Sequence, residues 1–383
     1  MALKVAKRGA VAPFLAMDML ARANRRQQAG GEVVHLEVGQ PGTPAPQAVL
    51  DAAARCLADG RIGYTEALGI GRLREAIAGH YRGFYGIEVP AERIAVTTGS
   101  SSGFLLAFLA AFEPGDRVAL ATPYYPAYRN FLIALGLEPV LLQASAESGF
   151  HPTPALLDGE PNLAGLIVAS PANPTGSMLS PEELKALVAY CNDRGIRFIS
   201  DEIYHGITFG KPVVSVADLD PHAIVVNSFS KYFSMTGWRI GWLVLPEDLV
   251  RPVERLAQNL YISAPALSQE AAIAALGCRA ELDAYAAAYT EKRRFLLREL
   301  PGCGLSDFAP CDGAFYLYID VGHLTNDSED LCHRVLDEAG VAMTPGLDFD
   351  PDRGQRYVRL SFAGPMSDME AAVARLRTFF GRS

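Results

Sequence analysis

Cysteine is scarce in this sequence, and its spacing argues against two kinds of site. Only six cysteines occur among 383 residues. None forms a Cys-x-x-Cys pair and none stands near a pair of histidines, so the pattern is typical neither of zinc sites nor of small disulfide-stabilised domains. The six are Cys56, Cys191, Cys278, Cys303, Cys311 and Cys332. We therefore predict reduced thiols, no bound metal and a cytoplasmic location.

Positive charge is in deficit, and long apolar runs are missing. The chain has 34 Lys and Arg against 43 Asp and Glu, a formal net charge of −9. A phosphate backbone attracts the opposite sign, so we expect no nucleic-acid partner. The longest uninterrupted apolar stretch, 103–112, is about half of the roughly 20 residues that cross a bilayer. Pro13 and Asp18 interrupt the apolar segment near the N-terminus, which argues against a secretory signal. We expect no membrane anchor.

The middle of the chain has an alternating pattern. Between about residues 60 and 250, short β-branched or apolar runs alternate with stretches of helical period, which predicts an α/β fold with a parallel sheet covered on both faces. Leu73, Ile77 and Tyr81 give one helix an apolar stripe, and the run Ser180-Pro181-Glu182-Glu183 predicts a capped helix start. The predicted strands are 94–98, 118–121, 139–142, 165–169, 197–200, 224–227 and 240–245.

The pattern changes after about residue 256. Ala-rich helical sequence continues to about residue 300, and short strands at 315–319 and 357–362 then flank a helix at 329–339. This order predicts a smaller α+β domain. A helix at 14–28 lies outside the alternating region, and we expect it to pack onto that smaller domain. The predicted division is an N-terminal segment 1–39, a large domain 40–270 and a small domain 271–383.

Polar residues follow three of the predicted strands, where ligands bind in open parallel sheets. The run Thr-Gly-Ser-Ser-Ser-Gly at 98–103 could bind a phosphate through backbone N–H groups, or simply cap a helix. The turn 170–176 holds the amide of Asn173 at a strand end, although its residues are ordinary turn formers. Asp201 follows a buried strand, with Tyr204 three residues later. A buried carboxylate needs a partner such as a protonated heterocyclic nitrogen, unless it only caps the next element.

A fourth segment, 228–241, carries the most specific pattern. It reads Ser-Phe-Ser-Lys-Tyr-Phe-Ser-Met-Thr-Gly-Trp-Arg-Ile-Gly, with Lys231 eight positions before Arg239. This segment resembles the lysine signature of the class I and II aminotransferases, and the three sites upstream match that family's other motifs in order. The resemblance covers essentially the whole chain. It implies fold type I of the pyridoxal 5′-phosphate (PLP) enzymes, with a large domain built on a mostly parallel seven-stranded sheet between helices. The N- and C-terminal segments would form a smaller α+β domain.

The resemblance also assigns roles at the cofactor. Lys231 would bind PLP as a Schiff base, and Arg239 would donate paired hydrogen bonds to its phosphate. Asp201 would keep the pyridine nitrogen protonated, and Tyr204 would lie against the ring oxygen. Lys231, Asp201 and Tyr204 are thus the expected catalytic residues. The other residues that the resemblance places on the cofactor are Gly99, Ser100, Ser101, Tyr125, Asn173, Ser228 and, from a neighbouring subunit, Tyr64.

Three residues are expected at the substrate. Arg359, in the segment 357–362, resembles the arginine that binds the substrate α-carboxylate, and Asn173 is expected at the substrate as well as at the cofactor. Gly39 belongs to a Gly-Gln-Pro turn that resembles the family's loop over the substrate. Tyr64, which precedes the segment 69–74, resembles the family tyrosine that reaches the neighbouring subunit's phosphate, and this resemblance implies a homodimer.

The implied activity is transfer of an amino group from an L-amino acid to a 2-oxo acid by a ping-pong mechanism, with the freed amine of Lys231 as general base. Ser101 stands where members that favour aspartate carry a lysine. Phe14 is expected in the pocket wall. Tyr125, or the adjacent Tyr124, is expected at the position of the family's aromatic residue that stacks on the cofactor. We therefore expect neutral or aromatic donors to be favoured over aspartate.

Three alternatives differ in class. A PLP-dependent β-lyase or decarboxylase could use the same lysine and aspartate, because the site selects which bond breaks. A PLP-binding transcription regulator would carry an additional DNA-binding domain. A nucleotide-binding Rossmann module is disfavoured, because its glycine motif is approached only at Gly69-Ile70-Gly71, where Arg74 replaces the third glycine.

Overall fold

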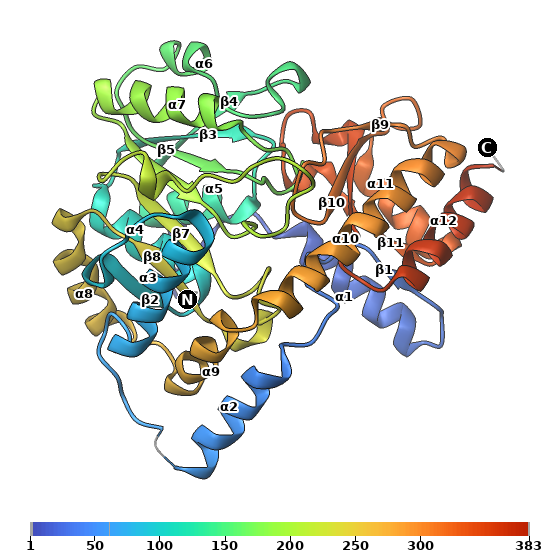
Figure 1. Cartoon of the computed structure of the whole chain (residues 1–383). Coiled ribbons are helices and arrows are strands. Elements are labelled where there is room, and N and C mark those ends of the chain that lie inside the picture. Colours follow the sequence, from blue (N-terminus) through green and yellow to red (C-terminus); the bar gives the residue numbers. More distant parts are fainter. Residues whose placement is uncertain (1–2, 61, 382–383) are drawn as a thin grey trace.

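A seven-stranded sheet forms the larger part of the molecule (Figure 1) in the computed structural model, which describes residues 3–60 and 62–381. The strand order is β2-β8-β7-β6-β5-β3-β4. Strand β8 is antiparallel to both neighbours, and the other neighbouring strands are parallel, so the mostly parallel seven-stranded sheet is confirmed. Each strand lies within two residues of its predicted bounds. These bounds are β2 Ile94–Thr97, β3 Arg117–Thr122, β4 Glu138–Gln143, β5 Leu163–Ala169, β6 Arg197–Asp201, β7 Ile224–Ser228 and β8 Gly241–Val244.

Successive residues of each strand point to opposite faces and enter two different cores. In β5, Leu166 and Val168 pack into one core and Ile167 into the other. Helices α3 and α7 cover the first face, and α4, α5 and α8 cover the second. The helices around the sheet are α2 Gln47–Ala58, α3 Gly71–Tyr85, α4 Gly99–Ala111, α5 Pro126–Leu135, α6 Pro154–Asp158, α7 Pro181–Asp193, α8 Glu247–Leu260 and α9 Ala266–Leu276.

Two local predictions about these helices are confirmed. The stripe of Leu73, Ile77 and Tyr81 is the buried face of α3. Helix α7 begins with a complete capping box, in which the Glu183 N–H donates to Ser180 Oγ over 3.2 Å and the Ser180 N–H donates to Glu183 Oε2 over 2.7 Å. The predicted start of this helix is therefore correct to the residue.

The C-terminal part contains a four-stranded antiparallel sheet, β12-β13-β10-β9. The predicted helix at 329–339 is α11 at its start but continues after Arg334 as a π-helical turn, Val335–Ala339. The elements are α10 Arg279–Glu299, β9 Asp307–Phe308, β10 Tyr316–Asp320, α11 Ser328–Arg334, β11 Val341–Ala342, β12 Thr344–Pro345, β13 Tyr357–Ser361 and α12 Met366–Phe380.

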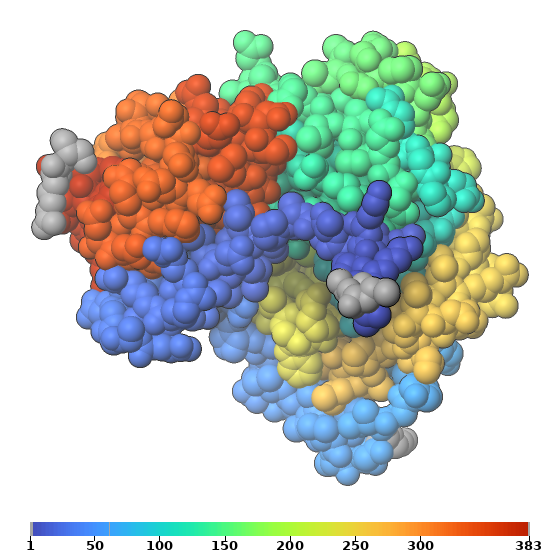
Figure 2. Space-filling model, turned by 180° about the vertical axis from the view of Figure 1, so that it is seen from behind, coloured from blue at the N-terminus to red at the C-terminus, as the bar shows by residue number. Residues whose placement is uncertain are grey.

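The N-terminal segment lies against this C-terminal part. Helix α1 (Leu15–Gln28) packs on β11 and β12, and β1 (Val34–His35) pairs in parallel with β11. Figure 2 shows the segment in dark blue, crossing from the green and cyan part of the chain to the orange-red C-terminal part. The domain boundaries at 39/40 and 270/271 stay a prediction.

No helix within 3–60 and 62–381 is long and apolar enough to cross a membrane. Over the same residues, no three His, Cys, Asp or Glu side chains are grouped so that they could hold a metal ion. All six cysteines are free thiols.

Candidate active site

A cavity of about 310 Å³ lies at one edge of the large sheet. The parallel strands end there, and because β8 is antiparallel, the residues that precede it reach the same edge. Helix α1, the segment after β1, and strands β10 and β13 of the C-terminal sheet contribute the rest of the wall. The cavity is lined by most of the predicted site residues, namely Gly39, Ser100, Ser101, Tyr125, Asn173, Asp201, Tyr204, Lys231, Arg239 and Arg359.

Lys231 follows β7 and is partly buried in the cavity wall. Its Nζ donates a hydrogen bond to the Gly39 carbonyl over 2.5 Å and lies 5.9 Å from the centroid of the Tyr204 ring. Burial, together with the positive charges of Arg359 and Arg239, lowers the pKa of Lys231 to about 8. The amine therefore loses its proton much more readily than an exposed lysine does, as a general base or a nucleophile must.

Asp201 ends β6 and is 4% exposed. The Ile203 N–H donates to its Oδ1 over 3.1 Å, and the Tyr128 hydroxyl donates to its Oδ2. Burial raises the pKa of Asp201 to about 6, against the opposing effects of these hydrogen bonds and of Lys231. A buried carboxylate held in this way is suited to a cationic partner in the cavity. Tyr128 was missed by the sequence reasoning, although its place three residues after Tyr125, within the first turn of α5, was a usable signal.

A cradle for an anion forms where α4 begins. Gly99, with φ of +75°, opens the helix, and a Cβ atom there would lie 2.4 Å from Arg239 Nη2. The guanidinium therefore lies directly against the helix N-terminus, whose free N–H groups carry partial positive charge. Ser100 and Ser101 line the cavity beside it, and Ser230 Oγ lies 3.5 Å from Arg239 Nη1. These convergent donors fit a phosphate group.

Three predicted cofactor residues do not line this cavity: Gly99, which lies against Arg239 at the start of α4, Ser228 and Tyr64. Ser228 is 1% exposed, and its Oγ lies 2.9 Å from Ser230 Oγ and 3.1 Å from the Ile240 carbonyl. The serine of this loop that lines the cavity is Ser230, which stands directly before the signature lysine and could have been chosen on that ground. Tyr64 is 84% exposed and lies away from its own chain's cavity.

Arg359 lies on β13 and is 2% exposed. Its Nη1 donates to Asn173 Oδ1 over 2.8 Å, and its Nη2 donates to the Glu37 carbonyl over 2.5 Å. The guanidinium carbon lies 4.5 Å from the ring centroid of Tyr316 and 4.7 Å from that of Phe349. Its Nε is buried without a hydrogen-bond partner among the described residues. A buried guanidinium on the wall of a cavity fits a carboxylate ligand.

Aromatic side chains form much of the remaining wall. Tyr125 lines the cavity and packs edge-on against Phe14, with ring centroids 5.8 Å apart, whereas the adjacent Tyr124 is buried outside the cavity. The hydroxyl of Tyr204 lies 2.7 Å from that of Tyr316, a cavity residue on β10 that the sequence reasoning did not select. Nothing in the local sequence distinguishes Tyr316 from the other apolar residues of that strand.

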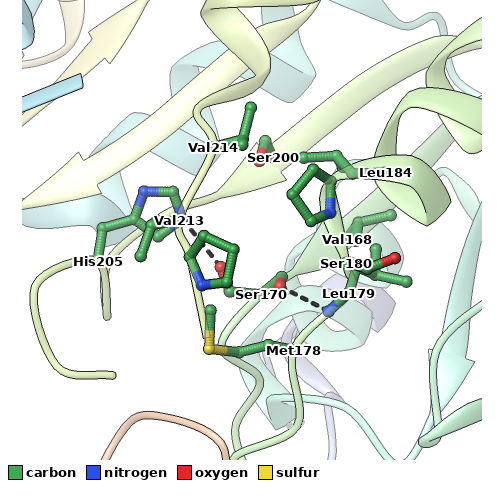
Figure 3. A pocket seen from close by; sticks show the side chains of 12 residues that line it. Val168, Ser170, Met178, Leu179, Ser180, Leu184, Ser200, His205, Val213 and Val214 are labelled. Carbon is green, nitrogen blue, oxygen red and sulfur yellow. Dashed lines mark hydrogen bonds between the residues drawn. The ribbon is translucent and has the colours of Figure 1, made fainter. Parts of the chain in front are cut away.

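Two hydrogen bonds to Ser170 support the turn 170–176, which carries Asn173 (Figure 3). The ring of His205 is hydrogen-bonded through Nε2 to the Ser170 carbonyl at 2.9 Å, and the Leu179 N–H donates to Ser170 Oγ over 3.0 Å. Burial lowers the pKa of His205 to about 3, so the ring is neutral at ordinary pH. The small cavity between these residues measures about 10 Å³, room for at most one water molecule. The two hydrogen bonds support the turn, and the cavity is too small to be a ligand site.

Comparisons with known proteins show the family of this chain. The family described as "Aminotransferase class I and II" matches residues 31–376. The chain is 48% identical over 378 residues to "Valine--pyruvate aminotransferase" of Mycobacterium tuberculosis, covering 97% of each chain. The structure of an aminotransferase from Mycobacterium tuberculosis superposes with a TM-score of 0.98 at 47% identity, covering 100% of both chains. The structure of aspartate aminotransferase from Thermus thermophilus with maleate superposes with a TM-score of 0.93 at 31% identity, covering 98% of this chain and 100% of that one. With the family match spanning nearly the whole chain, this protein belongs to the class I and II aminotransferases, transferases of fold type I.

Proposed function

We propose that this enzyme binds PLP covalently through Lys231 and moves an amino group from a neutral or aromatic L-amino acid to a 2-oxo acid by a ping-pong mechanism. The observation that carries the proposal is the convergence on one cavity of an amine, a buried carboxylate and an anion cradle, provided by Lys231, Asp201 and Arg239. When bound, PLP supplies an electron-withdrawing ring that stabilises negative charge at the substrate carbon.

The chain's own groups match the polar groups of this cofactor. Arg239 and the N-terminus of α4 would hold the phosphate, together with the hydroxyl of Ser230. Asp201 would pair with the ring nitrogen, because a buried carboxylate with a raised pKa gains most from a cationic partner. Tyr204 and Asn173 would contact the ring oxygen. The ring of Tyr125 would pack on the cofactor face. These assignments are supported by the placement of all these groups around one cavity.

The reaction also depends on how the chain handles the substrate. Arg359, which lines the cavity, would bind the α-carboxylate through its guanidinium, which fixes the α-carbon toward Lys231. The Lys231 amine would accept the proton from the α-carbon and return it later in the cycle, a task that its lowered pKa favours. Met17 and Leu20, on the face of α1 that lines the cavity, would exclude water during these proton transfers.

The wall of the cavity favours a substrate without a second carboxylate. Among the described residues that line it, the cationic side chains are Lys231, Arg239 and Arg359, and the roles above use all three. Phe14, on the wall near Tyr125, adds apolar surface. A distal carboxylate would therefore be desolvated without a cation from this chain, at a cost of several kcal/mol. The relative named as a valine–pyruvate aminotransferase supports the same class of neutral donor and acceptor.

A homodimer is part of the proposal. Tyr64 is 84% exposed, and other large apolar side chains are exposed as well, including Ile62, two residues before it, at 49%, Leu57 at 56% and Leu260 at 50%. A second subunit would cover this apolar surface, and Tyr64 would reach the phosphate of the neighbouring site.

The experiment for the reaction type follows the substrate nitrogen. An aminotransferase mixed with an amino acid and no acceptor should release about one equivalent of 2-oxo acid per active site and no ammonia, because the nitrogen stays on the enzyme. Adding pyruvate should restore turnover. Catalytic release of ammonia would instead identify a β-lyase, and release of carbon dioxide a decarboxylase.

A further inference from the structure

Tyr316 lies between three groups of the proposed site. It is on β10, is 1% exposed and lines the cavity. Its hydroxyl lies 2.7 Å from the Tyr204 hydroxyl, and its ring lies under the Arg359 guanidinium with 4.5 Å from centroid to Cζ. A Cβ atom on Gly39 would lie 1.8 Å from its hydroxyl oxygen. Tyr316 is therefore in contact with the proposed cofactor residue, the proposed carboxylate residue and the segment over the substrate.

The contact with Gly39 requires glycine at that position. No Cβ atom can lie 1.8 Å from an oxygen, so any side chain would displace either the loop or the tyrosine. The same Gly39 accepts the hydrogen bond from Lys231 through its carbonyl. The loop, the lysine and Tyr316 are thus held in one arrangement by close packing.

If Tyr204 donates its proton to the cofactor, the direction of the hydrogen bond between the Tyr204 and Tyr316 hydroxyls is fixed. Each hydroxyl has one proton and can also accept. A Tyr204 proton directed at a cavity ligand is unavailable to Tyr316, so the hydrogen bond between the two hydroxyls must then be donated by Tyr316. Such a chain polarises the Tyr204 hydroxyl and strengthens its donation. The charged groups around the pair are Arg359 from β13, Lys231 from the loop after β7 and Asp201 from β6.

We propose that Tyr316 is a positioning residue for the transamination reaction. Its hydroxyl donates to Tyr204 and so directs the Tyr204 proton into the cavity, while its ring supports the Arg359 guanidinium. The inference rests on the proposed function, and it separates two contributions of one side chain. The hydroxyl acts through Tyr204 on the cofactor, and the ring acts through Arg359 on substrate binding.

The same strand provides a matched control. Tyr318, two residues further along β10, is also 1% exposed, but its hydroxyl is buried without a hydrogen-bond partner among the described residues. Its ring stacks on Tyr357 with centroids 4.7 Å apart and belongs to a separate small cluster. Replacing either tyrosine by phenylalanine removes one buried hydroxyl, and only the Tyr316 change removes a contact with Tyr204.

The test compares Tyr316→Phe with Tyr318→Phe in the PLP-loaded enzyme. The first readout is the pH midpoint of the absorbance change of the bound cofactor. Weaker donation from Tyr204 stabilises the deprotonated cofactor less, so Tyr316→Phe should raise the midpoint by roughly 0.4 to 1 pH unit, the range for one net hydrogen bond. It should lower kcat roughly two- to tenfold while KM stays within about twofold, because the ring remains under Arg359. Tyr318→Phe should change none of these values.

A double substitution tests the route through Tyr204. In a Tyr204→Phe enzyme, Tyr316→Phe should have almost no further effect on the midpoint, because the residue through which it acts is gone. Additive effects would overturn the proposal, as would a Tyr316→Phe enzyme that matches Tyr318→Phe in midpoint and kcat. A lower melting temperature of Tyr316→Phe with an unchanged midpoint would show a purely structural role and would also overturn the proposal. A wild-type protein that binds no PLP would instead refute the proposed function.

Discussion

Arg359 donates a hydrogen bond to Asn173 Oδ1 over 2.8 Å, and so joins β13 of the C-terminal sheet to the turn after β5 of the large sheet. The two residues are 186 positions apart in sequence. Both line the cavity, so the site is complete only when the C-terminal strand and the large sheet are correctly docked. Binding of a substrate carboxylate at Arg359 would therefore also affect the contact between β13 and the turn after β5.

Replacement of Arg359 tests the carboxylate site. Arg359→Ala should lower kcat/KM for all amino donors together by about 2 to 4 kcal/mol, because each donor loses the same charge-assisted contact. Arg356→Ala is the control, since that arginine is three residues away, pairs with Asp320 and is 57% exposed. Steady-state kinetics on valine, phenylalanine and aspartate provide the comparison. A loss confined to one donor would place the α-carboxylate elsewhere.

The buried charge of Asp201 should destabilise the cofactor-free protein, and bound cofactor should offset this effect. Its pKa is raised by burial to about 6, so the cost of its charge appears as pH rises from about 4, its ordinary value, to about 6, and then persists. Asp201→Asn should therefore stabilise the cofactor-free protein by about 1 to 3 kcal/mol at pH 7.5, and by less at pH 4.5. The same variant should bind PLP more weakly. Urea unfolding at both pH values and PLP titration measure the two effects. An equal stability change at both pH values would contradict this assignment of charge.

Ser101 should limit the use of acidic donors. Ser101→Lys places a cation in the cavity wall, so it should raise the aspartate-to-valine ratio of kcat/KM by about tenfold, the factor for 1.4 kcal/mol of charge pairing. Ser102→Lys is the control, because Ser102 is the next residue on α4 but does not line the cavity. In the unmodified enzyme, kcat/KM should be higher for neutral or aromatic donors than for aspartate. Aspartate as the best donor would refute this reading of Ser101.

Tyr64 should act across the subunit boundary. Tyr64→Phe should weaken PLP binding by roughly 1.5 to 3 kcal/mol without changing assembly, because one hydrogen bond to a charged phosphate is lost. Mixed dimers with Lys231→Ala subunits give a sharper readout, since half of the sites in each mixed dimer are then intact. Activity that is impaired in both parents should partly return on mixing. A fully active monomer in solution would rule out the arrangement.

Much of this site was predictable, because its signals are local in sequence. Runs of β-branched residues located the seven strands, and the lysine segment located Lys231 and Arg239. The reversed direction of β8 was not predictable in the same way, since a short apolar run reads alike in either direction. Tyr128 and Tyr316 were missed because they matter through partners on other elements, at 73 and 112 positions' separation.

Ser228 and Ser230 show a related limit. They stand two residues apart at the end of β7, and only the course of the backbone there decides which serine lines the cavity. The π-helical turn after α11 is a third case, because the helical periodicity of 329–339 contains no sign that the last turn widens.

Covalent attachment of PLP at Lys231 is the central claim, and borohydride reduction of the PLP-loaded protein tests it most directly. Peptide mass spectrometry after reduction should find the pyridoxyl group on Lys231. Lys231→Ala should carry no such group and show no turnover while it stays folded. Lys211→Ala, at an exposed lysine paired with Asp312, should behave like the unmodified enzyme. A pyridoxyl group on a different lysine, or turnover that persists in Lys231→Ala, would contradict the claim.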